Sequence, residues 1–278
     1  MNRLRRLALG GSLLIALALT TAACEPALEP APKDIDGLAH WLWVNYLAAN
    51  DEEMADALKK VHTVADFAAF DEPLRMTITD LEQGELAVVE MEDRDPKPAV
   101  GMLVTNVFDC TIDKLEPVLY ALDQGAKYPE LYDTYSREYT SDLGAFQARE
   151  ANTISWTFTY EATPMPASRY RTTSNGQLRY VPDIDSDVTP FGDFLLQRIW
   201  MPQPVEYLET DANEFTLDFQ LEVYYQLDAT RVAHFYPVWR HMAFNGVGAS
   251  TDDDWVQDTI IGGLLDFDIR TEELCQGQ

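Results

Sequence analysis

The chain has few positive charges. Its 278 residues include 20 Lys and Arg against 47 Asp and Glu, which gives a formal net charge of -27. Nucleic-acid binding needs clustered Lys and Arg to neutralise phosphates, so this composition excludes a basic nucleic-acid-binding protein. With 46% hydrophobic and 11% aromatic residues, the sequence can nevertheless form a packed core, which argues against intrinsic disorder.

Long apolar runs are also missing after the N-terminus. Arg3, Arg5 and Arg6 precede a short apolar stretch at 7–19, an order typical of secretory signal peptides. The stretch is too short for a comfortable transmembrane helix, and no second run of 18 or more apolar residues follows it. We therefore expect residues 1–23 to be a signal peptide and the protein to be exported.

Small residues then lead to a cysteine. Residues 20–24 read Thr-Thr-Ala-Ala-Cys and resemble a bacterial lipobox, although Thr21 stands where that pattern usually has Leu. The resemblance implies that Cys24 is acylated, palmitate included, and anchors the protein to the cell envelope, at the outer membrane or periplasmic face. The alternative is ordinary cleavage with Cys24 as an incidental thiol, but an exposed thiol would be reactive. The proline-rich residues 24–34 predict an extended tether.

Only two cysteines remain, Cys110 and Cys275. An exported protein meets an oxidising environment, so an even pair suggests a disulfide, the alternative being two unpaired buried thiols. Such a disulfide would close a long loop and would be worth about 4–5 kcal/mol in the chain-entropy model. The Cys and His spacings of a zinc site are absent, and the sequence predicts no metal and no cofactor.

Hydrophobic periodicity indicates helices first and strands afterwards. Residues 34–69 carry apolar side chains at helical spacing on both sides of a polar break, which predicts an αα-hairpin. Residues 74–109 switch to strand composition, with one strand over 86–89. His40 and His62 lie in the hairpin, and we interpret them as surface or satisfied core histidines rather than metal ligands.

The clearest strands lie between residues 152 and 245. Apolar and polar side chains alternate over 154–160 and again over 215–225, which predicts strands with one face on a core and one face in water. Asn175-Gly176 is typical of a hairpin turn. Pro237 is expected to interrupt a further strand over 231–243. Together these segments predict an antiparallel sheet.

The chain ends in a segment of helical periodicity. Three acidic residues at 252–254 suit its first turn, where the helix dipole favours carboxylates. Val256 and Ile260 lie on its apolar face. The pair Gly262-Gly263 is unusual in a helix because each Gly costs about 1 kcal/mol relative to Ala. Close approach to another element, a ligand, or a mild kink would explain the pair.

From about residue 100 this order of elements resembles a known superfamily. Residues 193–200 read Asp-Phe-Leu-Leu-Gln-Arg-Ile-Trp and resemble the D-F-x-x-x-R-x-W strand of START lipid-transfer domains. Pro202 and Pro204 come too soon to match the His-Pro segment that follows in many of those domains, so the wider START-like (SRPBCC, helix-grip) superfamily is the better match. The resemblance implies an α+β fold, with a curved antiparallel sheet around a long C-terminal helix at 100–278. Residues 35–99 would add a helical hairpin and short strands.

The resemblance also implies an apolar or lipid ligand between the sheet and the final helix. The expected cavity residues are Trp156, Phe158, Tyr180, Leu196, Arg198, Trp200 and Phe219. A buried Arg198 would need a carboxylate or a ligand anion, because an unpaired buried charge is costly. The alternative is a filled core in which Arg198 pairs with an Asp on the wet face.

Two other functions stay open. The first is a non-catalytic envelope protein with a filled core that binds partners through an aromatic patch at 235–240, although the same residues could equally form the core face of the last strand. The second, less supported, is a hydrolase using His234 or His241, since the sequence has neither a Gly-x-Ser-x-Gly nor a His-Glu-x-x-His motif. A buried His–carboxylate pair with a shifted pKa in a cleft would favour catalysis. We expect no catalytic residues and a protein that is not an enzyme.

Overall fold

The structure, a computed structural model, describes residues 28–65, 74–163, 168–182, 192–209 and 213–277. Cys24 and the predicted signal peptide lie outside these residues. Within them, no helix combines the length and the apolar character that a membrane span requires.

The described residues form both strands and helices. The strands are β1 (Leu74–Ile78), β2 (Val100–Phe108), β3 (Thr134–Tyr139), β4 (Thr153–Ala162), β5 (Tyr170–Val181), β6 (Phe194–Trp200), β7 (Glu206–Tyr207), β8 (Asn213–Gln226), β9 (Val232–Phe244) and β10 (Ala249–Ser250). The helices are α1 (Ile35–Asn45), α2 (Asp51–Ala65), α3 (Ile112–Leu119), α4 (Gln124–Lys127), α5 (Leu143–Gln147) and α6 (Asp254–Gln276), together with the 3-10 helix η2 (Gln83–Val89).

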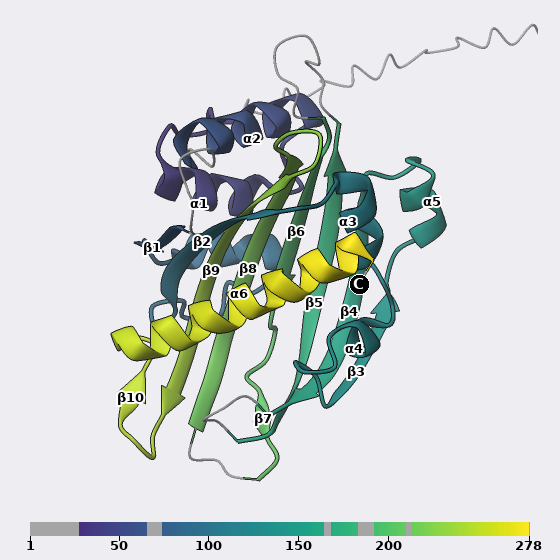
Figure 1. Cartoon of the computed structure of the whole chain (residues 1–278). Coiled ribbons are helices and arrows are strands. Elements are labelled where there is room, and N and C mark those ends of the chain that lie inside the picture. The colour runs from purple at the N-terminus through teal and green to yellow at the C-terminus, as the bar shows by residue number, and fades with distance from the viewer. Residues whose placement is uncertain (1–27, 66–73, 164–167, 183–191, 210–212, 278) are drawn as a thin grey trace, which may run out of the picture.

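The strands build one antiparallel sheet in the order β1-β2-β9-β8-β6-β5-β4-β3, with β10 against β9 and β7 against β5. The long helix α6 crosses one face of this sheet, and α1 and α2 cover the other side (Figure 1). We call these the α6 face and the hairpin face. A sheet wrapped around its C-terminal helix is the helix-grip arrangement, so the predicted fold is confirmed.

Alternation along the strands explains why both faces are buried. In β9, Tyr236 and Val238 point to the α6 face and pack in one cluster with Ile260 of α6. The next residue, Trp239, points to the hairpin face and meets the ring of Trp43 of α1 edge-on at 6.0 Å between centroids. Helices on both faces leave these central strands no solvated side.

The predicted αα-hairpin is present as α1 and α2. Their apolar side chains share one cluster with side chains of β6, β8 and β9. β1 pairs with β2 as an edge strand of the same sheet. The helices α1 and α2 and the strand β1 therefore share a core and a sheet with the later strands.

The expected hairpin turn at Asn175-Gly176 is wrong. β5 continues through both residues, and Gly176 pairs with Trp156 of β4 and Ile199 of β6. A Cβ at Gly176 would lie 2.4 Å from Cε2 of Trp156. Glycine is needed here because the indole of Trp156 lies against the β5 backbone, not because the chain turns.

Two other local expectations also need correction. The strand expected at 86–89 is part of η2, whose start is capped when the backbone N–H of Glu82 donates to the Glu85 carboxylate at 2.7 Å. Pro237 does not end β9. Because Pro has no N–H, pairing with β8 is interrupted beside it and resumes at Val223 and Phe235.

The described part of the expected tether is held on the hairpin. The indole N–H of Trp41 donates to the carbonyl of Glu29 at 2.9 Å, and Nζ of Lys60 donates to the carbonyl of Ala31 at 3.1 Å. The side chain of Ala31 is buried. Glu29 and Ala31 therefore lie against α1 and α2.

A disulfide joins Cys110, just after β2, to Cys275 in the last turn of α6, with the Cα atoms 5.9 Å apart. The two cysteines are 165 residues apart in the chain, and both lie in one buried cluster with Leu115 and Phe146. The bond therefore fixes the C-terminal end of α6 to the sheet.

We expect the double substitution Cys110→Ser and Cys275→Ser to lower the free energy of unfolding by about 3–5 kcal/mol, because the unfolded chain loses a long closed loop. Urea unfolding of the variant and of the oxidised wild type measures this difference. Peptide mapping without reductant should recover the two cysteines joined, whereas two alkylatable thiols in native protein would contradict the bond.

Candidate functional site

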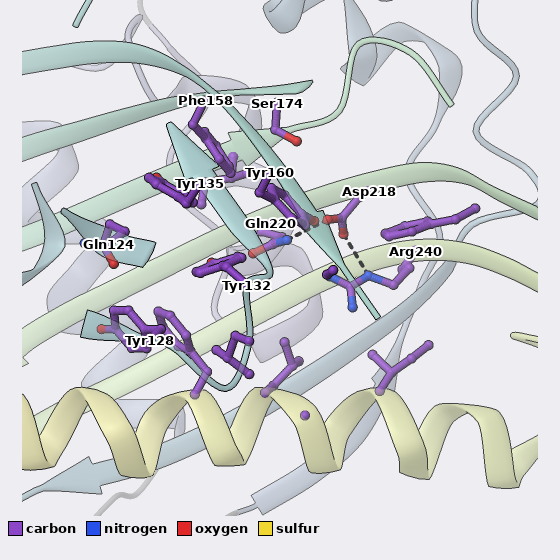
Figure 2. A pocket seen from close by; sticks show the side chains of 18 of the residues that line it. Gln124, Tyr128, Tyr132, Tyr135, Phe158, Tyr160, Ser174, Asp218, Gln220 and Arg240 are labelled. Carbon is purple, nitrogen blue, oxygen red and sulfur yellow. Dashed lines mark hydrogen bonds and ion pairs between the residues drawn. The ribbon is translucent and has the colours of Figure 1, made fainter. Parts of the chain in front are cut away.

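A cavity of about 360 Å³ lies between the α6 face of the sheet and α6. Figure 2 shows aromatic side chains converging on it, with Gln124 and Tyr128 at one end and Arg240 at the other. The main apolar and aromatic lining residues are Tyr135, Phe158, Tyr160, Phe215, Leu264 and Phe267.

The strand pattern determines which side chains reach the cavity. Alternation in β4 places Phe158 and Tyr160 on the α6 face. In β8 the register shifts between Phe215 and Leu217. A bulge of this kind moves the following side chains to the opposite face, so both Phe215 and Asp218 line the cavity.

Gly263 of α6 leaves space where the helix covers the cavity. It lines the cavity, and a Cβ built at either Gly262 or Gly263 would meet no atom within 4 Å. Close approach to another element therefore does not explain the glycine pair. A ligand in the cavity would explain Gly263, because a side chain at that position would enter the cavity.

One end of the cavity carries a paired charge. Nε of Arg240 donates to Oδ1 of Asp218 at 2.9 Å. Gln220 donates to the same carboxylate at 2.6 Å and accepts from the hydroxyl of Tyr236 at 2.5 Å. Burial alone would lower the pKa of Arg240, but the Asp218 carboxylate raises it above its usual range. The group is therefore a neutral network of satisfied polar atoms.

A second buried charge cluster ties α6 to the sheet. Nδ1 of His234 on β9 lies 3.1 Å from Oδ1 of Asp268 on α6, and Nε2 lies 3.6 Å from the Glu222 carboxylate on β8. Neither contact has the alignment of a hydrogen bond. Both are ion pairs when the imidazole of His234 is protonated. Burial would lower the pKa of His234, but the two carboxylates raise it to about 9.

This cluster is the buried His–carboxylate pair that would favour catalysis, yet its position gives it another role. Glu222 lines the cavity, whereas His234 is fully buried behind it and stacks on Tyr224 with ring centroids 4.2 Å apart. The imidazole does not line the cavity. The cluster therefore connects β8, β9 and α6 rather than presenting a base to a ligand.

Four of the seven predicted cavity residues lie on the wrong face. Leu196, Trp200 and Phe219 pack in the cluster of the hairpin face, and Arg198 lies there too. The sequence pattern identified the two faces of β6 and β8 but not which helices cover each. Phe158 lines the cavity. Trp156 and Tyr180 pack in the cluster around the disulfide, beyond the lining residues.

Arg198 has neither of its expected partners among the described residues. Its guanidinium donates to the carbonyl of Trp43 at 3.1 Å and to Oε1 of Gln177 at 2.8 Å, and lies 4.5 Å from the ring centre of Tyr46. Burial lowers its pKa to about 10. Arg198 therefore attaches α1 to the sheet instead of binding a ligand anion.

The sequence pattern missed the polar side chains of the cavity. Gln197, Asp218, Gln220 and Glu222 all line it. In the sequence they alternate with apolar residues and indicate a wet face. The same alternation suits a polar cavity wall under a helix, and only the apolar face of the C-terminal helical segment indicated such a cover.

The aromatic patch expected at 235–240 is not exposed. Phe235, Val238 and Trp239 are fully buried, so of the two expected roles the segment has the core face and not the interaction surface. His40 lies between the Glu85 carboxylate, 2.9 Å away, and the carbonyl of Thr79, 3.1 Å away. Among the described residues no group of three or more His, Cys, Asp or Glu is placed to hold a metal ion.

No protein-family model and no curated protein matches the chain in sequence. Solved structures do match it. Human STARD10 is 8% identical over 72% of this chain and 82% of its own, with a TM-score of 0.39. A STAR-related lipid transfer protein of Xanthomonas axonopodis is 11% identical over 61% of this chain and 76% of its own, with a TM-score of 0.36. The Zhui aromatase/cyclase of Streptomyces sp. R1128 is 12% identical over 64% of this chain and 91% of its own, with a TM-score of 0.35.

The sheet and the covering α6 form a helix-grip arrangement. At such low identities and TM-scores the similar structures carry no argument about function, which depends on the residues that line this cavity.

We expect the ion pairs of His234 to make stability depend on pH. Because its folded pKa is raised, their contribution is complete below the unfolded pKa of about 6.5 and is lost as the pH rises through about 9. The loss should be on the order of 3 kcal/mol, measured by urea unfolding between pH 6 and pH 10. His234→Gln should flatten this dependence, while His241→Gln should keep it. Equal pH slopes in all three proteins would refute the assignment.

Proposed function

We propose that the protein is a lipid-anchored component of the bacterial cell envelope that holds an apolar or lipid ligand between the sheet and α6. The cavity of about 360 Å³ is the observation that carries this function. Its volume lies in the range of about 300–1,000 Å³ that is usual for small-molecule sites. Apolar walls with a few placed polar groups are the composition of such sites.

The arrangement of the cavity favours holding a ligand over transforming it. The acids Asp218 and Glu222 are each paired with a cation, and the imidazole of His234 lies behind the wall. Aromatic rings from β3 and β4 offer large contact areas, and Gly263 leaves room in the cover. These features suit binding through surface burial, which is why we propose a carrier or sensor rather than an enzyme.

The anchor rests on the sequence alone. Residues 20–24 resemble a lipobox, and removal of residues 1–23 takes away three Arg residues and no acid. The mature chain would then be more acidic than the net charge of -27, and a basic patch would not hold it on an anionic membrane. Acyl chains on Cys24 would supply the attachment instead.

Cys24→Ser should therefore move the protein from the membrane fraction to the soluble fraction of fractionated cells, because the acylated residue is lost. Immunoblotting of the two fractions measures this change, and Cys110→Ser is a control that leaves the anchor intact. If the Cys24→Ser protein stays with membranes, the anchor is not at that residue.

Filling the cavity should weaken ligand binding. We expect Gly263→Trp to weaken the binding of the uncharged fluorescent probe N-phenyl-1-naphthylamine at least tenfold, because the indole enters the space under α6. Gly262→Trp is the matched control, since the neighbouring Gly262 does not line the cavity. Fluorescence titration measures both affinities. Equal affinities for both variants and the wild type would place the probe, and the proposed ligand, elsewhere.

A further inference from the structure

Arg137 of β3 is a cation in the cavity wall that no carboxylate of the described residues neutralises. Its Nε donates to the hydroxyl of Tyr135 at 2.8 Å, and one terminal nitrogen donates to the carbonyl of Leu119 at 2.8 Å. The guanidinium lies 4.5 Å from the ring centre of Trp156. A guanidinium has five N–H donors, and these two hydrogen bonds use only two of them.

The other buried charges around the cavity are already paired, which sets Arg137 apart. Arg240 lies 2.9 Å from Asp218, and Glu222 lies 3.6 Å from His234. The chain has 47 acidic residues against 20 basic ones, so acidic partners for an Arg are plentiful. A half-buried cation in the cavity without one is poised for an anion that the protein does not supply.

Tyr135 adds a second donor beside this cation. Its side chain lines the cavity and projects toward it in Figure 2. Burial raises its pKa, so the hydroxyl keeps its proton. Since the phenolic oxygen accepts from Arg137, the phenolic hydrogen is left to donate to a ligand. A guanidinium with an adjacent hydroxyl donor is suited to the two oxygens of a carboxylate.

We propose that the cavity takes an apolar monocarboxylic acid, whose carboxylate binds Arg137 and Tyr135 and whose apolar part extends under α6 toward Gly263. This inference rests on the proposed function and adds the chemical class of the ligand. The cavity volume of about 360 Å³ lies near the small end of ligand sites, which favours one acyl chain or a compact ring system over a two-chain phospholipid.

The test compares an acid with its uncharged analogue. Dodecanoate and dodecanol displace N-phenyl-1-naphthylamine from the purified full chain at pH 7.5, in the wild type, Arg137→Gln, Arg137→Lys and Arg75→Gln. Arg75 is the matched control because it is a half-exposed cation outside the cavity, 4.0 Å from Asp258. Circular dichroism of each variant checks that it is folded.

We expect the wild type to bind dodecanoate at least fivefold more tightly than dodecanol. Arg137→Gln should weaken the binding of dodecanoate at least tenfold and change the affinity for dodecanol less than twofold, because only the acid contacts the guanidinium. Arg137→Lys should keep part of the preference, since it keeps the charge without the fork, and Arg75→Gln should keep all of it.

Two results would overturn the inference while leaving the proposed function intact. One is a wild type that binds the alcohol as tightly as the acid, a comparison that needs no variant. The other is an Arg137→Gln protein whose affinities for dodecanoate and dodecanol fall equally, as expected if Arg137 only packs on Trp156. A wild type that does not bind the naphthylamine probe at all would instead remove the proposed function and the inference together.

Discussion

The burial of one sheet on both faces is the constraint on which the rest of this structure depends. On the hairpin face, Trp43 of α1 packs against Phe219 and Trp239, and on the other face α6 packs through residues such as Ile260. Central strands covered in this way have no wet side. Every polar side chain that they carry must therefore find a partner inside the protein.

The polar residues of β8 and β9 meet that demand by pairing across the α6 face. Asp218 pairs with Arg240, and Glu222 and Asp268 flank His234, so the helix and two strands are held by charge as well as by packing. The cavity is the space that α6, fixed by this cluster and by the disulfide, leaves over the sheet. Because α6 covers the sheet without filling the space above it, both polar and apolar side chains of the strands line the cavity.

The sequence predicted the elements better than their surroundings. Local periodicity identified the αα-hairpin, the strands β4 and β8 and the final helix, and the even number of remaining cysteines indicated the disulfide. It could not tell which layer covers each face, so Leu196 and Phe219 were assigned to the cavity although they pack under α1 and α2. Gly176 was taken for a turn because the approach of Trp156 comes from another strand. Contacts between distant segments leave no trace in local alternation.

The central claim is that an apolar molecule occupies the space between α6 and the sheet. The most direct measurement is a crystal structure of the protein grown with a brominated hydrocarbon, using the anomalous signal of bromine to locate it. We expect a bromine peak enclosed by Phe158, Tyr160 and Leu264, beside Gly263. Side chains that fill this space, or a bromine peak confined to the hairpin face or the outer surface, would contradict it.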